Sequence, residues 1–202
     1  MIRRLEWEGA HNVRDLGRLP AMDGRRTQWG AVVRSASLDH LTPLGWSALH
    51  SHGIQTIVDL RNTEERTLSV AGATVVQVPL EEGLDDDPEY STWKATGRLA
   101  TPLYYSGFLE RWPDRCAAAV AAVARAESGG VVVHCGRGRD RTGLIVMLLL
   151  ALVGVPPEDI AADYAIGAAA TFDQSVRDTV ASLDLESVIT GVDLTALRRR
   201  LL

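Results

Sequence analysis

Short apolar runs along the chain predict strands that alternate with helices. The runs at 31–35, 54–60, 74–79 and 131–133 are rich in β-branched and aliphatic residues, and they have the length of buried strands. We expect a further short strand at 3–8. Strands separated by helices are typical of an α/β domain, so we predict a central, mostly parallel sheet flanked by helices.

The helices are predicted from start and stop residues and from longer apolar runs. Thr42-Pro43 is a typical helix start and Gly53 a typical stop, which places a helix between them up to about Ser51. The run from Leu144 to Val153 is apolar on every side, as expected of a helix enclosed by its own protein. Further helices are expected at 117–126, 160–170, 172–185 and 193–201, and residues 90–111 are helix-compatible and could cover the site.

Composition narrows the function classes. The chain has 202 residues, which fits a single domain over 1–202, and its net charge of −5 argues against a generally basic nucleic-acid binder. No signal peptide follows Met1, and the apolar stretch 143–155 is too short to span a bilayer. Only Cys116 and Cys135 are present, which favours free thiols and a cytoplasmic location. We expect no metal and no cofactor; the oligomeric state cannot be inferred.

The loop between the valine strand and the apolar helix is the strongest candidate for chemistry. Cys135 begins it and Arg141 ends it, with five residues between them. Gly136 and Gly138 allow the backbone to turn sharply. Amides that point into such a loop, at a helix N-terminus, bind anions, and an arginine fork can complete the site. The pattern therefore predicts a phosphate-binding loop with a cysteine nucleophile.

The same groups favour the reactive thiolate form of Cys135, because cations and helix N-termini stabilise a sulfur anion. The hydroxyl of Thr142 could donate a hydrogen bond to this sulfur in a later step of the reaction. The alternative is that Cys135 is an inert, buried cysteine, which is a common role for free cysteines. The agreement of the strand, the glycines, the arginine and the helix favours the nucleophile.

Residues His134 to Gly143 resemble the signature of the cysteine-dependent protein tyrosine phosphatase superfamily. The stretch 138–143 is most similar to a bacterial branch of tyrosine/serine phosphatases, whose loop ends Gly-Lys-Asp-Arg-Thr-Gly. Members of that branch act on phosphoproteins and some also on phosphoinositides. This chain departs from the branch at Arg137, which replaces a small residue, and at Arg139, which replaces lysine.

Residues 12–17 resemble the Asn-Phe-Arg-Asp-Leu-Gly-Gly opening of the same branch, with Val13 for Phe and Arg18 for the second Gly. We expect Arg14 and Asp15 to support the rim of the active site. The alternative is an exposed ion pair, which would contribute little to stability.

Further matching patches lie after the predicted strands. Arg61 follows the strand that ends near residue 60, so it could position the loop or the substrate, or it could pair with Glu64 or Glu65. The matching patches are Val33-Arg34-Ser35, Asp59-Leu60-Arg61, Glu64-Glu65 and Asp163-Tyr164. The acidic loop 81–88 is expected to be solvated rather than to bind a metal.

The triplet Trp112-Pro113-Asp114 resembles the general-acid loop of eukaryote-type tyrosine phosphatases. It lies only 21 residues before Cys135, and a helix and a strand take up most of that distance. We therefore expect Asp114 to cap the helix that follows. The bacterial branch instead carries its aspartate inside the loop, which is Asp140 here.

The resemblance implies a two-step, metal-independent hydrolysis of phosphate monoesters. Cys135 would attack phosphorus, Asp140 would act as acid and then base, and Arg141 would bind the phosphate. His134 would orient the loop by hydrogen bonding. The remaining residues expected to bind substrate are Gly136, Arg137, Gly138, Arg139 and Thr142.

Three alternatives stay open. A rhodanese-like sulfurtransferase does not predict the Arg-Thr-Gly ending of the loop, and a silent phosphate-binding module would have lost Cys135, Asp140 or Arg141. A phosphatase of phosphoinositides or small phosphate esters is harder to separate from a protein phosphatase. Arg137 and Arg139 would favour a substrate with more than one phosphate.

Overall fold

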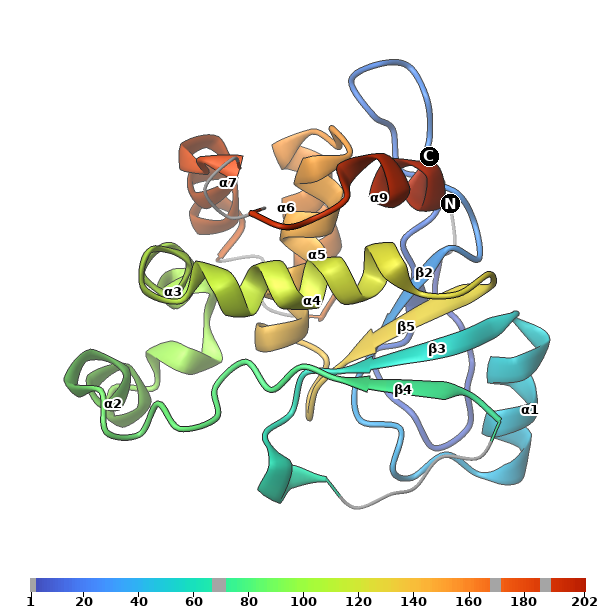
Figure 1. Cartoon of the computed structure of the whole chain (residues 1–202), viewed down its shortest axis with the longest axis horizontal. Coiled ribbons are helices and arrows are strands. Elements are labelled where there is room, and N and C mark those ends of the chain that lie inside the picture. Colours follow the sequence, from blue (N-terminus) through green and yellow to red (C-terminus); the bar gives the residue numbers. More distant parts are fainter. Residues whose placement is uncertain (1–2, 67–71, 168–171, 186–189) are drawn as a thin grey trace.

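The computed structural model describes residues 3–66, 72–167, 172–185 and 190–202 (Figure 1). Its centre is a five-stranded sheet with the strand order β1-β2-β5-β3-β4. Strands β2 to β5 are parallel to one another, and β1 pairs with β2 in the antiparallel direction. The strands are β1 (Arg14–Asp15), β2 (Val32–Ser35), β3 (Ile54–Asp59), β4 (Thr74–Gln77) and β5 (Gly130–His134).

The helices lie on both faces of this sheet, with α1 on one face and α4 and α5 on the other (Figure 1). The helices are α1 (Pro43–Ser51), α2 (Pro88–Ala95), α3 (Tyr105–Arg111), α4 (Pro113–Arg125), α5 (Asp140–Leu152), α6 (Pro157–Gly167), α7 (Asp173–Ser182) and α9 (Leu194–Leu201). Short 3-10 turns occur at Thr63–Glu65, Arg98–Ala100 and Pro102–Tyr104. In the described part of the chain, no helix has the length and apolar character needed to cross a bilayer.

Both faces of strand β5 are buried, which explains its uninterrupted run of valines. Val131 and Val133 point into the larger core, shared with α4 and α5, whereas Val132 points into a smaller core that contains Leu49 of α1. Side chains alternate between the two faces of a strand, so a central strand covered on both sides needs apolar residues at every position. The predicted α/β architecture is confirmed.

Most predicted elements are confirmed, with shifted ends. The strand at 74–79 ends earlier, at Gln77, and the two apolar helices begin earlier, at Pro113 and Asp140. The strand predicted at 3–8 is wrong: only an isolated bridge joins Arg4 to Arg14. The neighbouring strand β1 has just two residues, so it is too short to pair with a strand of six residues.

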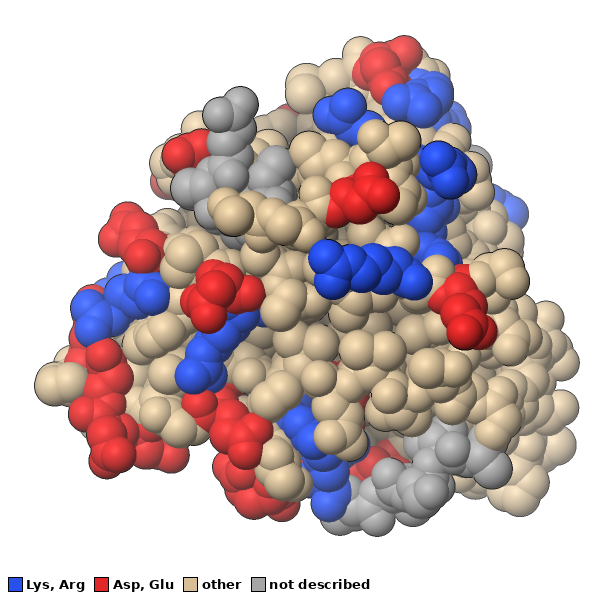
Figure 2. All heavy atoms as spheres, in the orientation of Figure 1, with Lys and Arg blue, Asp and Glu red and all other residues tan. Residues whose placement is uncertain are grey.

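The acidic loop before α2 stabilises that helix. Asp87 accepts hydrogen bonds from the amides of Glu89 and Tyr90 and so caps the helix. Asp85 pairs with Lys94 at 2.6 Å. Figure 2 shows carboxylates gathered at this end of the molecule.

Candidate active site

Cys135 lies at the centre of the carboxyl edge of the sheet. Strand β5 ends at His134, which is in register with Ser35 of β2 and Asp59 of β3. Cys135 follows and is buried, with 3% of its surface exposed. In parallel α/β sheets this edge is where ligands bind.

The carbonyl groups of the loop point outward, toward other parts of the protein. The amide of Ser37 donates to the carbonyl of Gly136 at 2.9 Å, and Asn12 Nδ2 donates to the carbonyls of Arg137 and Gly138 at 3.4 and 2.8 Å. In a trans peptide the N–H points opposite to the C=O, so the amides of residues 137–139 point into the loop. No described residue accepts a hydrogen bond from them. The backbone therefore forms a cradle for an anion.

Gly138 is the position at which this cradle requires glycine. Its φ is +65°, and a Cβ atom there would lie 2.3 Å from the carbonyl oxygen of Ser35. Any other residue would combine a left-handed backbone with a collision against strand β2. The loop and the neighbouring strand thus fit together only with glycine at this position.

Behind the loop, Asp163 of α6 is fully buried and pairs with three arginines. Its carboxylate accepts from Arg3 Nη2 at 2.7 Å, from Arg14 Nε at 3.1 Å and from Arg34 Nη1 at 2.8 Å. The other terminal nitrogen of Arg34 donates to the carbonyl of Gly138 at 2.9 Å. We call these four residues the cation-rich cluster, and it holds the loop from inside.

Three cations against one carboxylate leave this cluster with excess positive charge. Burial, and then the charge of Arg34, lower the pKa of Arg14 to about 10. Burial alone would raise the pKa of Asp163, but the charges of Arg34 and Arg14 outweigh it and hold that pKa well below its usual range. Asp163 is therefore a permanent carboxylate at ordinary pH.

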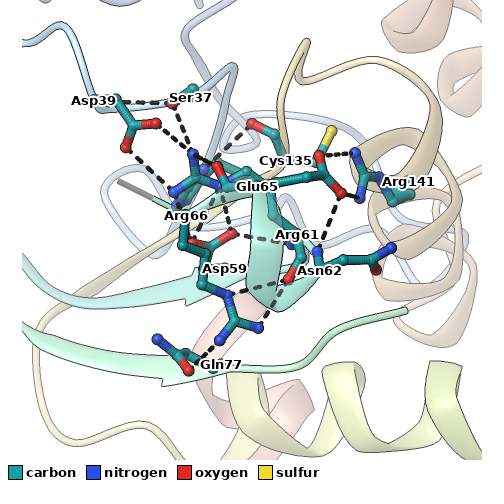
Figure 3. Close-up of polar contacts among 11 residues, drawn as sticks. Ser37, Asp39, Asp59, Arg61, Asn62, Glu65, Arg66, Gln77, Cys135 and Arg141 are labelled. Carbon is teal, nitrogen blue, oxygen red and sulfur yellow. Dashed lines mark hydrogen bonds and ion pairs between the residues drawn. The ribbon is translucent and has the colours of Figure 1, made fainter. Parts of the chain in front are cut away.

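On the other side of the loop, Arg141 in the first turn of α5 is held by two carboxylates. Its Nη1 and Nη2 donate to Oε1 and Oε2 of Glu65 at 2.5 and 2.7 Å (Figure 3). Its Nε lies 3.4 Å from Oε2 of Glu81. We call these three residues the carboxylate-rich cluster. Figure 3 shows Cys135 beside the contact between Arg141 and Glu65.

The geometry leaves one side of Arg141 for a ligand. A guanidinium can bind an oxyanion through its two terminal nitrogens or through Nε and one terminal nitrogen. Glu65 takes the first of these edges, and only the longer contact with Glu81 lies at the second. A phosphate in the cradle could use the second edge while Glu65 keeps the side chain in place.

The two glutamates differ in their ionisation. Burial alone would raise the pKa of Glu65, but its hydrogen bonds with Arg141 outweigh burial and lower that pKa. Burial raises the pKa of Glu81, and the negative charges of Glu65 and Asp140 raise it further. The positive charge of Arg141 lowers it but does not outweigh these effects. Of the two, Glu81 is therefore the one that takes up a proton more readily.

Asp140 begins helix α5 and is paired with its neighbour Arg139, whose Nε lies 3.1 and 3.3 Å from its carboxylate oxygens. Arg139 also donates to the carbonyl of Ala100 at 3.0 Å, and the hydroxyl of Tyr105 donates to the carbonyl of Asp140 at 2.8 Å. The guanidinium of Arg139 thus contacts the protein itself, and its predicted role in substrate binding stays a prediction. Arg137 is exposed.

Thr142 and His134 are both buried, and His134 directly precedes Cys135 in the sequence. The hydroxyl of Thr142 has no hydrogen-bond partner among the described residues, and the hydrogen bond expected from it to the sulfur in a later step stays a prediction. His134 Nδ1 lies 3.3 Å from the carbonyl of Cys135, and its Nε2 lies 3.8 Å from Asp59. Burial lowers the pKa of His134, although the charge of Asp59 opposes the shift.

Two further residues of the matching patches, Arg61 and Asp15, make no direct hydrogen bond with the loop among the described contacts, although Arg61 donates to Ser37, whose amide binds the carbonyl of Gly136. Arg61 pairs with Asp59 and Asp39, at 2.9 and 2.5 Å, and reaches only the backbone carbonyl of Glu65; the predicted ion pair with Glu64 or Glu65 is wrong. Asp15 is buried and binds His52 at 2.7 Å and the amides of Gly17 and Gly30.

Asp114 is in the first turn of α4, but its side chain does not cap the helix. The capping position is taken by Trp112, because Pro113 already occupies the first helical position. The capping role predicted for Asp114 is therefore wrong. It lies in a surface hollow with Ala117 and Gly191, which contains no residue of the phosphate loop.

Several residues hold the loop or its arginine, directly or through another side chain, although sequence reasoning gave them no such role: Asn12, Arg34, Glu65, Glu81 and Asp163. Asn12, Glu65 and Asp163 lie in patches that resemble the bacterial branch, so the resemblance could have indicated them. Glu81 carried no such signal, and the prediction of a solvated loop was wrong for it: its side chain is 12% exposed and contacts Arg141.

The comparisons with known proteins agree with this geometry. A Cupriavidus necator protein, whose name describes a tyrosine-protein phosphatase, is 31% identical over 79% of this chain and 61% of its own length. A tyrosine-protein phosphatase of Nostoc commune is 30% identical over 75% of the chain and 53% of its own length. The triple specificity protein phosphatase PtpB of Mycobacterium tuberculosis is 29% identical over 79% of the chain and 67% of its own length.

The chain thus spans less than two thirds of the first two relatives. The sequence model of the tyrosine phosphatase family matches residues 5–199, which include the cysteine loop, the carboxylate-rich cluster and all of the cation-rich cluster except Arg3. This chain belongs to the tyrosine phosphatase family.

Proposed function

We propose that this protein hydrolyses phosphate monoesters, with phosphotyrosine in proteins as its substrate, through a phosphocysteine intermediate. The observation that carries the proposal is the cradle of unpaired amides over Cys135, next to the Arg141 side chain. Donors in this arrangement bind a tetrahedral phosphate and stabilise the charge on its equatorial oxygens in the transition state.

In the first step, the thiolate of Cys135 attacks phosphorus in line with the ester oxygen. The S–P bond forms as the P–O bond to the leaving group breaks. Asp140 in its protonated form gives its proton to the departing oxygen, which leaves as an alcohol or phenol. Arg139 holds the Asp140 side chain at the start of α5.

In the second step, water attacks the phosphocysteine. The carboxylate of Asp140 accepts a proton from this water as the new P–O bond forms, and the S–P bond breaks to regenerate the thiolate. Because the nucleophile is a free thiol, we also propose that the enzyme works in a reducing compartment such as the cytoplasm.

The first experiment replaces the nucleophile. Cys135→Ser should abolish turnover of a phosphotyrosine peptide while leaving binding of that peptide measurable by calorimetry. Cys116→Ser is the matched control, because Cys116 is the other free thiol and is buried on helix α4, outside the phosphate loop. Full turnover by Cys135→Ser would overturn the proposal.

The second experiment decides between the two aspartates. Asp140→Asn should slow the hydrolysis of phosphotyrosine by about a hundred- to ten-thousand-fold, and that of an activated aryl phosphate much less, because a good leaving group departs without a proton. Asp114→Asn should behave as wild type on both substrates. The opposite pattern would return the acid role to the Trp-Pro-Asp triplet.

A further inference from the structure

A second concave site lies beside the phosphate loop. It is a pocket of about 600 Å³ lined by Arg3, Arg4, Arg14, Arg137 and Arg139, and Cys135 does not line it. No aspartate or glutamate of the described residues is part of its wall. Five arginines thus line one hollow, which gives this part of the surface a positive potential.

Two of these arginines have no counter-ion in the described structure. Arg3 and Arg14 pair with Asp163, and Arg139 pairs with Asp140. The side chains of Arg4 and Arg137, in contrast, make no ion pair or hydrogen bond with any described residue. They are the two groups of the pocket that remain available for a ligand.

The pocket and the catalytic loop share structure. Arg137 is two residues beyond Cys135, so their Cα atoms cannot be more than about 7 Å apart. Asn12, which also lines the pocket, donates to the carbonyls of Arg137 and Gly138 and so connects the pocket wall to the cradle. A molecule bound over Cys135 therefore has this pocket within reach.

We propose that the pocket is a second phosphate-binding subsite, which takes another phosphate monoester group on the same substrate molecule. Arg4 and Arg137 bind this group, and the excess charge of the cation-rich cluster favours it. Guanidinium forks match the paired oxygens of phosphate, and a dianion uses two forks better than a single carboxylate does. This inference rests on the proposed function, because it assumes that the first phosphate lies over Cys135.

The test measures binding to the inactive Cys135→Ser protein, so that turnover does not change the ligands. The peptide probes carry one phosphotyrosine followed by serine, phosphoserine or glutamate. The soluble small-molecule probes are an inositol monophosphate and an inositol bisphosphate. We expect the second phosphate to tighten binding by about ten- to hundredfold in at least one of these series.

Arg4→Gln, made in the Cys135→Ser protein, should lower this gain by about three- to fivefold, and adding Arg137→Gln should remove most of the rest. The matched control is Lys94→Gln, which removes one positive charge from α2, at the opposite end of the molecule from the amino terminus (Figure 1). It should leave the gain unchanged. A gain that persists in the Arg4/Arg137 double variant would overturn the assignment.

The ligand series also identifies the chemistry. A gain with the peptide, the inositol or both supports the subsite and shows where its second phosphate comes from. No gain in either series overturns it, as does an equal gain from glutamate, which would mean a general carboxylate site. Turnover of the singly phosphorylated peptide by the wild type is a separate measurement: its absence would refute the proposed function while a gain from the second phosphate remained interpretable.

Discussion

The cation-rich cluster and the carboxylate-rich cluster hold the same loop with opposite charge balances. Around Asp163, three arginines share one buried carboxylate. Around Arg141, two glutamates share one guanidinium. The side chains of the first cluster are at most 10% exposed, whereas the side chain of Glu65 is 33% exposed.

The difference separates two tasks that arginines perform at an anion site. The cation-rich cluster lies behind the loop, binds the carbonyl of Gly138 through Arg34 and supplies positive charge without needing to contact the ligand. The carboxylate-rich cluster fixes the direction of the Arg141 side chain, and its negative charge lowers the attraction of this side of the loop for anions. We therefore expect the cation-rich cluster to maintain the cradle and the carboxylate-rich cluster to influence which anions the cradle binds.

Removing the carboxylate of the cation-rich cluster should have the largest effect, which is on stability. Asp163→Asn leaves the buried side chains of Arg14 and Arg34 without a counter-ion, which typically costs about 3–5 kcal/mol of unfolding free energy. Urea unfolding measures the loss. Asp23→Asn, which breaks the exposed pair with Arg25, is the control and should leave the midpoint unchanged. If Asp163→Asn loses as little unfolding free energy as the control, the ion pairs of the cation-rich cluster do not stabilise the fold.

Changes in the carboxylate-rich cluster should affect activity more than stability. Glu65→Gln weakens the paired hydrogen bonds that orient Arg141, so kcat/KM for a phosphotyrosine peptide should fall by about ten- to hundredfold. Glu64→Gln is the control, because Glu64 is the exposed neighbour and does not contact Arg141. An increase in activity of Glu65→Gln would show instead that Glu65 competes with the substrate.

The smallest effect concerns Glu81 and pH. Its pKa is raised, so it is protonated at a higher pH than an ordinary glutamate and becomes a carboxylate as the pH rises through that value. The ionised form competes with anions for Nε of Arg141. The inhibition constant of sulfate should therefore rise with pH. This rise should be about two- to fivefold larger in the wild type than in Glu81→Gln. Sulfate suits this test because its charge is constant over the range.

Parallel pH curves for the two proteins would place Glu81 outside the anion site, and the distinction between the two clusters would then rest on Glu65 alone. Glu82→Gln is the matched control, since Glu82 is the next residue along the same loop. Its curve should overlay that of the wild type.

Much of the site is determined by residues that are neighbours in the sequence. The valine strand, Cys135, the glycines and the apolar helix are contiguous, and their order alone places a cysteine in a tight loop at a helix start. Apolar runs likewise predict the parallel sheet, because a strand buried on both faces has few other compositions open to it.

The partners of the arginines were decided only by the tertiary structure. Arg141 meets Glu65 across 76 positions and Arg14 meets Asp163 across 149. In the sequence these are ordinary charged residues, which could equally be solvated, as Arg137 is. Whether a charge is buried and paired depends on which elements the fold brings together, because desolvation and Coulomb attraction are both set by surroundings from distant parts of the chain. The sequence by itself therefore determines the position of Cys135 and its loop, whereas the packing of α6 and of the 3-10 turn at Thr63–Glu65 against that loop determines which charges surround it.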